Sequence, residues 1–129
     1  MYEQEHAQGR RSQPGCVSLH GNGAGGSSSR GVVNLFGQRY PGPPKDANGD
    51  GKRQREQWFA QALQALGAHP SVQGQHISLA FPCEIGCGLA GGDWVVYQRM
   101  IEDFTRNRPT LTVTIVRFGG VAPGKRARC

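Results

Sequence analysis

The stretch "HISLAFPCEIGCGLAGGDW", residues 76–94, constrains the fold of this 129-residue chain more than any other. An apolar run ends at Pro82, Gly86, Gly88 and Gly91 follow, and a helical pattern begins directly after the last glycines. A short apolar run bounded by turn residues predicts a buried strand, and glycine permits the tight backbone that joins a strand to a helix. The sequence therefore predicts a strand–loop–helix unit of an α/β fold.

The rest of the chain supplies further elements of the same kinds. Residues 53–66 and 93–106 carry apolar side chains at three- and four-residue spacing, which predicts two amphipathic helices. The apolar face of the second helix is expected to hold Trp94, Tyr97, Ile101 and Phe104. Apolar and β-branched runs predict strands at 32–36, 76–81 and 110–118 and a shorter strand at 16–20.

The long elements follow one another in the order βαβαβ. Strands separated by helices are typical of a parallel sheet with right-handed crossovers, and ligands bind such sheets at the carboxyl ends of the strands. The turn-rich segment 37–52 and the glycine-containing segment 82–92 both follow strands. We therefore expect these two loops to lie at the same edge of the sheet, where a ligand would bind.

Composition predicts one domain with polar extensions. Gly and Pro make up 20 and 8 of the residues and apolar types only 36%, which is typical of a loop-rich chain with one modest core. We expect a disordered tail over residues 1–15, a flexible Gly/Ser loop or hairpin insertion over 21–31, and a basic tail over 119–129.

Charge favours an anionic partner. Lys and Arg number 15 against 9 Asp and Glu, and a surplus of this kind attracts nucleotides, nucleic acid or phosphorylated ligands. No run approaches the roughly 18 apolar residues of a membrane span, and the N-terminus has no apolar signal segment. The expected location is the cytoplasm, with the nucleus as an alternative, and no membrane partner is expected.

Cysteine spacing does not indicate a metal site. Cys83 and Cys87 form C-x-x-x-C, but Cys16 and Cys129 stand far from them, and the four histidines are scattered. No second pair has zinc-finger spacing. We therefore predict no metal and no cofactor, and thiols that stay reduced in a reducing compartment.

The segment "DANGDGKRQREQ" (46–57) partly matches an EF-hand calcium loop. Asp46, Asn48 and Asp50 occupy the first ligand positions, but Gln57 stands where the loop requires a bidentate glutamate. The prolines before the segment also forbid the helix that should precede it. The segment is interpreted as a solvated turn, with weak cation binding as the alternative.

The glycines of the opening stretch spell G-x-G-x-x-G, the dinucleotide-binding pattern. That fingerprint also needs an acid at the end of the next strand, where this chain has Arg117 and Phe118, and it allows almost no residues between strand and first glycine. A dinucleotide fold is therefore not favoured. Glycine backbone N–H groups before a helix N-terminus remain suited to a phosphate. The alternative is a tight turn without a ligand.

The segment "PCEIGCGLAGGDWVVYQRMIEDF" resembles the second ligand loop and following helix of macrodomains, the ADP-ribose-binding α/β/α modules. It is most similar to the branch related to terminal ADP-ribose glycohydrolase and to phage and bacterial macrodomain-like proteins. "VVNLFGQ" (32–38) resembles the preceding strand of that branch. The resemblance covers residues 16–118. It implies a macrodomain-like three-layer α/β/α sandwich around a βαβαβ core, truncated at its N-terminus.

The resemblance also implies a site. The diphosphate and distal ribose of ADP-ribose would be held, mostly by backbone amides, at Gly86, Cys87, Gly88, Leu89, Ala90 and Gly91. Asn34 and Gln38 are candidate additional ligand contacts. Trp94 would pack beneath the loop and Asp93 would cap the following helix.

Two departures from the family bear on activity. Hydrolase members that form a lysyl intermediate carry a Lys and an Asp at the places of Gln38 and Ala90, so that mechanism is not expected here and no catalytic residue is assigned. The family's first strands, helix and loop, which contact adenine, have no clear counterpart. "LHGNGAGGSSS" (19–29) is interpreted as an insertion, with a substitute for that first loop as the alternative.

Three functions remain open from sequence. The chain could recognise ADP-ribose and hydrolyse it from modified proteins, or process ADP-ribose 1″-phosphate. It could equally be a non-catalytic reader of ADP-ribose or of an ADP-ribosylated protein. The third reading is a degenerate domain with weak nucleic-acid binding.

Overall fold

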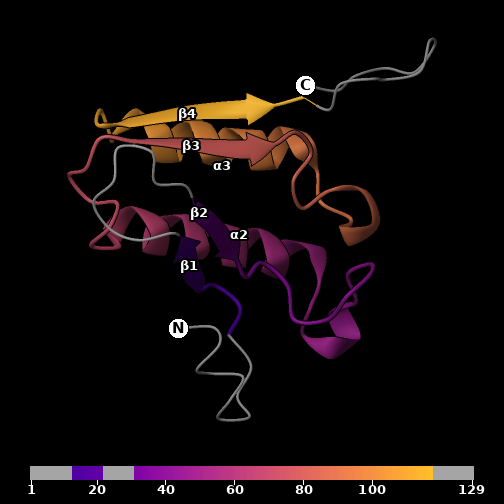
Figure 1. The fold of residues 1–129 in the computed structure, drawn as a ribbon. Coiled ribbons are helices and arrows are strands. Elements are labelled where there is room, and N and C mark those ends of the chain that lie inside the picture. The colour runs from indigo at the N-terminus through magenta and orange to yellow at the C-terminus, as the bar shows by residue number, and fades with distance from the viewer. Residues whose placement is uncertain (1–12, 22–30, 118–129) are drawn as a thin grey trace.

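The computed structural model describes residues 13–21 and 31–117, and Figure 1 shows a mixed α/β fold. Most of the predicted tails (1–15 and 119–129) and of the predicted loop 21–31 falls outside these residues. The elements are β1 (Val17–Gly21), β2 (Gly31–Leu35), the 3-10 turn η1 (Asp46–Asn48), α2 (Lys52–Ala68), β3 (Ile77–Pro82), the 3-10 turn η2 (Gly88–Ala90), α3 (Trp94–Arg106) and β4 (Leu111–Val116).

The four strands form two sheets of two strands each. β3 and β4 pair in parallel, from Ile77 opposite Leu111 onward, so the predicted parallel crossover through α3 is confirmed. β2 pairs antiparallel with β1, with Val17 opposite Leu35, so the prediction that β2 joins the same parallel sheet is wrong. The entropy of closing a loop grows with its length, which favours the local hairpin over a pairing across α2.

The elements are arranged in two layers. In Figure 1 the strands lie in front of the two helices. Helix α2 packs on the β1–β2 hairpin, α3 packs on β4, and the two helices pack on each other. Alternate residues of β3 face the helices and solvent, Phe81 being buried and Ser78 and Ala80 exposed. The described residues thus form one layer of strands and one layer of helices.

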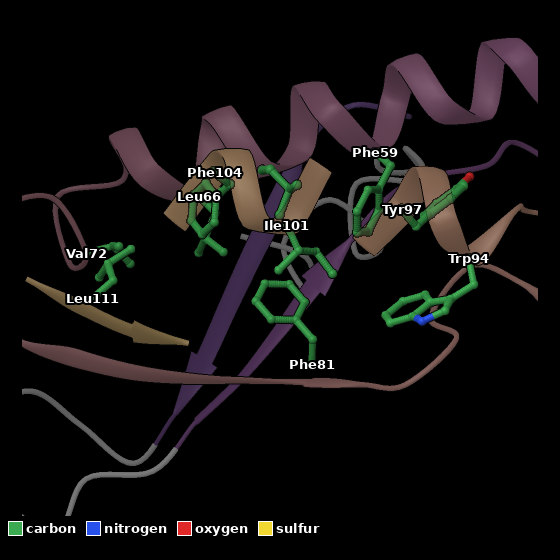
Figure 2. Packing of buried hydrophobic residues seen from close by; sticks show 10 residues of the cluster. Phe59, Leu66, Val72, Phe81, Trp94, Tyr97, Ile101, Phe104 and Leu111 are labelled. Carbon is green, nitrogen blue, oxygen red and sulfur yellow. The ribbon is translucent and has the colours of Figure 1, made fainter. Parts of the chain in front are cut away.

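The core lies between the helices and the strands (Figure 2). The predicted face of α3 is confirmed, because the buried residues of that helix are Trp94, Tyr97, Ile101 and Phe104. From α2, Phe59 meets the Tyr97 ring with 4.7 Å between centroids. β3 and β4 contribute Phe81 and Leu111. One continuous cluster therefore joins both helices to the parallel sheet.

Helix α2 extends further than its sequence predicts. Gly67, the first residue after the predicted helix 53–66, is a buried residue within α2, and His69 forms the C-cap. A side chain at this position would overlap the guanidinium of Arg108, which packs over the helix there. The glycine thus serves close packing, and Pro70 follows the true end.

An open groove of about 1080 Å³ separates β2 from β3. Residues 31–36 line one side, Ser78–Pro82 and Ile85 line the other, and Leu66 of α2 also borders it. None of the described residues that line this groove carries a charged side chain. Over the described ranges, neither helix combines the length and hydropathy that crossing a bilayer would require.

Candidate functional site

The glycine loop, residues 86–91, is held in shape by its own backbone. The Cys87 N–H donates to the Glu84 carbonyl at 2.9 Å, the Gly91 N–H to the Gly88 carbonyl at 2.9 Å, and the Gly92 N–H to the Gly86 carbonyl at 3.0 Å. The loop leaves the carboxyl end of β3 and leads directly into α3. It is therefore a compact turn at the edge of the parallel sheet where ligands of such folds bind.

The backbone itself explains the glycine pattern. Gly86, Gly88 and Gly91 have φ angles of +75°, +70° and +81°, a region that side-chain-bearing residues adopt only with strain. Glycine at these three places is required by the turn whether or not a ligand is present. The pattern alone therefore does not distinguish a phosphate-binding loop from a bare turn.

The surroundings of the three glycines do differ. A Cβ on Gly86 would lie 2.7 Å from the Tyr97 ring, and one on Gly91 would lie 2.6 Å from Pro44, so both face packed protein. A Cβ on Gly88 would have no atom of the described residues within 4 Å, apart from its own chain neighbours. The neighbouring Leu89 side chain is 76% exposed. Gly88 and Leu89 thus form the open side of the loop.

The start of α3 behaves as predicted. The Asp93 carboxylate accepts a hydrogen bond from the Val95 N–H at 3.0 Å, so the predicted N-cap is confirmed. Trp94 is only 5% exposed and joins the core (Figure 2). Among the described residues, its indole Nε1 is the one buried side-chain polar atom without a hydrogen-bond partner. Leaving such a donor unpaired costs about 1–3 kcal/mol, so it marks a place where an acceptor would be stabilising.

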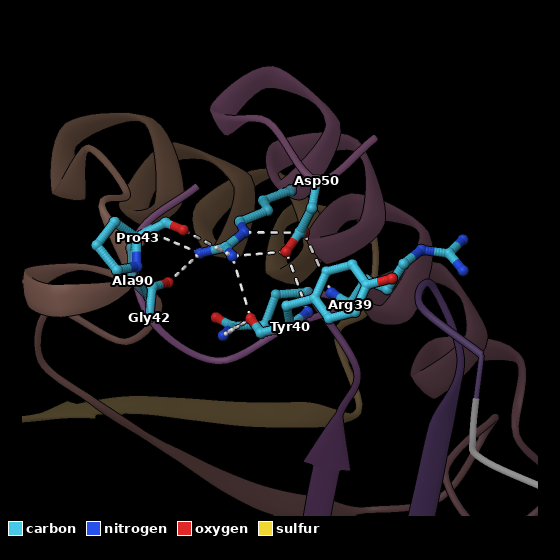
Figure 3. Close-up of polar contacts among 8 residues, drawn as sticks. Arg39, Tyr40, Gly42, Pro43, Asp50 and Ala90 are labelled. Atoms are coloured by element: carbon cyan, nitrogen blue, oxygen red, sulfur yellow. Dashed lines mark hydrogen bonds and ion pairs between the residues drawn. The ribbon is translucent and has the colours of Figure 1, made fainter. Parts of the chain in front are cut away.

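The second loop, residues 37–51, is organised by a buried ion pair (Figure 3). The Arg55 guanidinium donates from Nη2 to Asp50 Oδ2 at 2.7 Å and from Nε to Asp50 Oδ1 at 3.0 Å. The two residues are 2% and 1% exposed. The carboxylate also accepts the N–H groups of Arg39 and Tyr40 at 3.1 and 3.0 Å.

These contacts stabilise the charged form of Asp50. The hydrogen bond from Arg55 lowers the pKa of the carboxyl group most, and the two backbone N–H groups lower it further. Burial acts in the opposite direction. The result is a pKa lowered from 3.8 to about 2. The pair therefore remains ionised throughout the neutral and mildly acidic range.

Arg55 also connects this loop to the glycine loop. Its Nη1 donates to the carbonyl of Gly42 at 2.8 Å and to the carbonyl of Ala90 at 2.9 Å, while Nη2 reaches the Tyr40 carbonyl at 3.1 Å (Figure 3). Pro44 packs on Gly91 beside this junction. The two loops therefore lie together as predicted, although the strands before them belong to different sheets and not to one parallel sheet.

The solvated-turn interpretation of residues 46–57 needs correction at its centre. Asp46 and Asn48 are exposed as expected, but Asp50 is buried with both carboxylate oxygens accepting N–H donors. Arg55, which belongs to the same segment, is buried as well. The sequence does contain an indication of this burial. Arg55 lies four residues before Phe59, on the apolar face of α2, and a charged side chain on that face requires a partner.

The two additional contacts predicted from sequence have different positions. Gln38 donates from Nε2 to the Tyr40 carbonyl at 2.8 Å, the same carbonyl that Arg55 binds, so it lies at the junction of the loops. Asn34 is exposed on the hairpin and its amide is 3.5 Å from Ser18 Oγ. It lines the groove between β2 and β3 rather than the glycine loop.

Candidate metal ligands are dispersed. Within residues 13–21 and 31–117, no three His, Cys, Asp or Glu side chains come close enough to hold an ion. Cys83 is disulfide-bonded, whereas Cys16 and Cys87 are in no disulfide. The expectation of reduced thiols is therefore wrong for Cys83, and Cys129 lies outside the described residues.

No family model, no curated protein and no solved structure matches this chain. The resemblance to macrodomains therefore depends on the residues of its two motifs, "VVNLFGQ" and "PCEIGCGLAGGDWVVYQRMIEDF".

Proposed function

We propose that this chain is a macrodomain-like module that binds ADP-ribose through the glycine loop. The observation that carries the proposal is Gly88, whose position opens to free space in a loop at the carboxyl end of a parallel strand. The space beside Gly88 holds no described atom within 4 Å of a Cβ position, so a ligand group can approach the backbone there. The macrodomain resemblance implies that the diphosphate and distal ribose of ADP-ribose would bind at this opening.

The local electrostatics are consistent with a diphosphate. The glycine loop precedes the N-terminus of α3, whose helix dipole favours negative charge. The chain as a whole carries a formal net charge of +6, which favours anionic partners in general. These features support a phosphate-bearing ligand and disfavour a cationic one.

The proposed role is recognition without hydrolysis. Gln38 and Ala90 stand where lysyl-intermediate hydrolases of the family carry a Lys and an Asp. Asp93 is occupied as the N-cap of α3, and Asp50 is buried in its pair with Arg55. Neither aspartate is therefore available as a general base. An ADP-ribosylated protein, or free ADP-ribose, is the proposed partner of this reader.

A matched pair of glycine substitutions tests the proposal. Gly88→Glu places a long anionic side chain in the open space of the loop. Gly74→Glu is the control, because Gly74 has nearly the same φ, +72°, and equally open surroundings, but precedes β3 instead of following it. Both changes introduce the same charge and similar backbone strain, so only the distance from the proposed site differs.

Isothermal titration of ADP-ribose should show saturable binding to the wild type and to Gly74→Glu and none to Gly88→Glu. Folded wild-type protein that binds no ADP-ribose, or equal losses in the two variants, would contradict the proposal. Incubation with a mono-ADP-ribosylated protein should release no ADP-ribose above the uncatalysed background. Nucleic-acid affinity that survives Gly88→Glu and falls steeply with salt would instead favour the degenerate, nucleic-acid-binding reading.

A further inference from the structure

One side chain bridges two loops that are far apart in sequence. Arg55 holds the carbonyls of Gly42 and Ala90 with the same nitrogen, Nη1, at 2.8 and 2.9 Å. Ala90 is 35 residues away in the chain. The guanidinium is fixed in turn by its bidentate contact with Asp50. A rigid, buried donor thus contacts the backbone of the glycine loop from the protein interior.

We infer that Arg55 is a positioning residue for the proposed ADP-ribose site, holding the glycine loop in its binding conformation and coupling it to residues 39–43. The identity of the ligand rests on the proposed function, whereas the contact between Arg55 and the Ala90 carbonyl does not depend on it. Arg55 is buried, whereas the open side of the loop is at Gly88 and Leu89. It therefore acts on the ligand only through the loop backbone.

The geometry explains why the loop depends on this residue. The Ala90 carbonyl belongs to the last residue of η2, directly before the positive φ of Gly91. Fixing that carbonyl limits rotation of the peptide unit between the two residues and so restrains the turn that presents Gly88 and Leu89. The contact of Gly91 with Pro44 adds packing at the same place. A preorganised loop loses less conformational entropy when it binds.

A lysine cannot replace this arginine. The guanidinium donates in several directions within one plane, toward Asp50, Gly42, Tyr40 and Ala90 at once. An ammonium group keeps the charge but has no planar fork of donors. Arg55→Lys is therefore expected to preserve the attraction to Asp50 while losing the bridge to Ala90.

Amide hydrogen exchange tests the inference directly. The amides of Cys87, Gly91 and Gly92 donate hydrogen bonds within the loop region, so their exchange rates report its opening. Arg55→Lys is the main variant and Arg55→Met a second one. The controls are Ile101→Val, a mild change at a buried core residue ten positions beyond Gly91, and wild-type protein in urea at matched global stability.

Both Arg55 variants should exchange these amides about tenfold faster or more than controls of equal global stability, since one hydrogen bond to a charged group accounts for at least such a factor. Amides of the β3–β4 ladder should follow global stability alone. If the loop amides accelerate only as much as in the matched controls, Arg55 merely stabilises the fold and the inference is overturned. This result is read without any ligand, so it is independent of the proposed function.

ADP-ribose provides a second readout that separates coupling from stability. Coupling is reciprocal, so ligand bound at the glycine loop should slow exchange of the Tyr40 amide, which donates to Asp50, in the wild type. In Arg55→Lys this slowing should be lost, and the affinity for ADP-ribose should fall about tenfold. Slowing at Tyr40 that persists unchanged in the variant would overturn the inference. Absence of binding by the wild type would refute the proposed function and leave the exchange test of Arg55 standing.

Discussion

Replacing Asp50 by asparagine should remove a pH-dependent part of the protein's stability. The folded pKa of Asp50 is about 2 against an ordinary value of 3.8, so the native state favours the carboxylate. A difference of this size corresponds to roughly 2.5 kcal/mol in the free energy of unfolding. That contribution is complete well above pH 3.8 and is lost as the pH falls through the folded pKa. About half of it should remain at pH 3.

Urea unfolding followed by tryptophan fluorescence, repeated between pH 7 and pH 3, measures this contribution. The wild type should be more stable than Asp50→Asn by at least about 2.5 kcal/mol at pH 7, because the amide group also faces the N–H donors of Arg55 and Tyr40. The gap should narrow by about 1 kcal/mol on acidification to pH 3. If the unfolding free energies of the two proteins change in parallel with pH, Asp50 does not titrate as a buried, paired carboxylate.

Two further substitutions test the loop and the cap that follows it. Gly91→Ala should destabilise the fold more than Gly74→Ala by about 1–3 kcal/mol in urea unfolding, since both strain a positive φ but only the first also collides with Pro44; equal losses would refute the packing of the two loops. Asp93→Ala should cost about 1 kcal/mol in the same assay, because the Val95 N–H loses its acceptor, and an unchanged stability would show that the cap is not formed in solution.

Local structure could be predicted from this sequence because the patterns are strong. The apolar spacing in 93–106 predicts both the limits of α3 and the four residues it buries, and Asp93 is the cap that its position suggests. The strands of the parallel pair begin and end within two residues of their predicted limits. Here side-chain periodicity and turn residues indicate the same answer.

Pairing and burial of charge could not be predicted in the same way. The residues "VVNLF" do not indicate which strand they will pair with. Their hairpin with β1 forms in competition with a pairing to β3, which would require the longer connection through α2. Arg55 follows Lys52 and Arg53 and looks solvated until its place on the apolar face of α2 is considered. Its contact with Ala90 depends on tertiary structure, which no local pattern encodes.

ADP-ribose is proposed to bind at the open side of the glycine loop, at Gly88 and Leu89. The most direct test is a titration of ADP-ribose into ¹⁵N-labelled protein, followed by two-dimensional amide spectra in which glycine signals are well separated. Saturable shifts should be largest at Gly86, Gly88, Leu89 and Gly91, and the signal of Gly74 should not move. Absence of shifts, or shifts confined to the groove between β2 and β3, would contradict it.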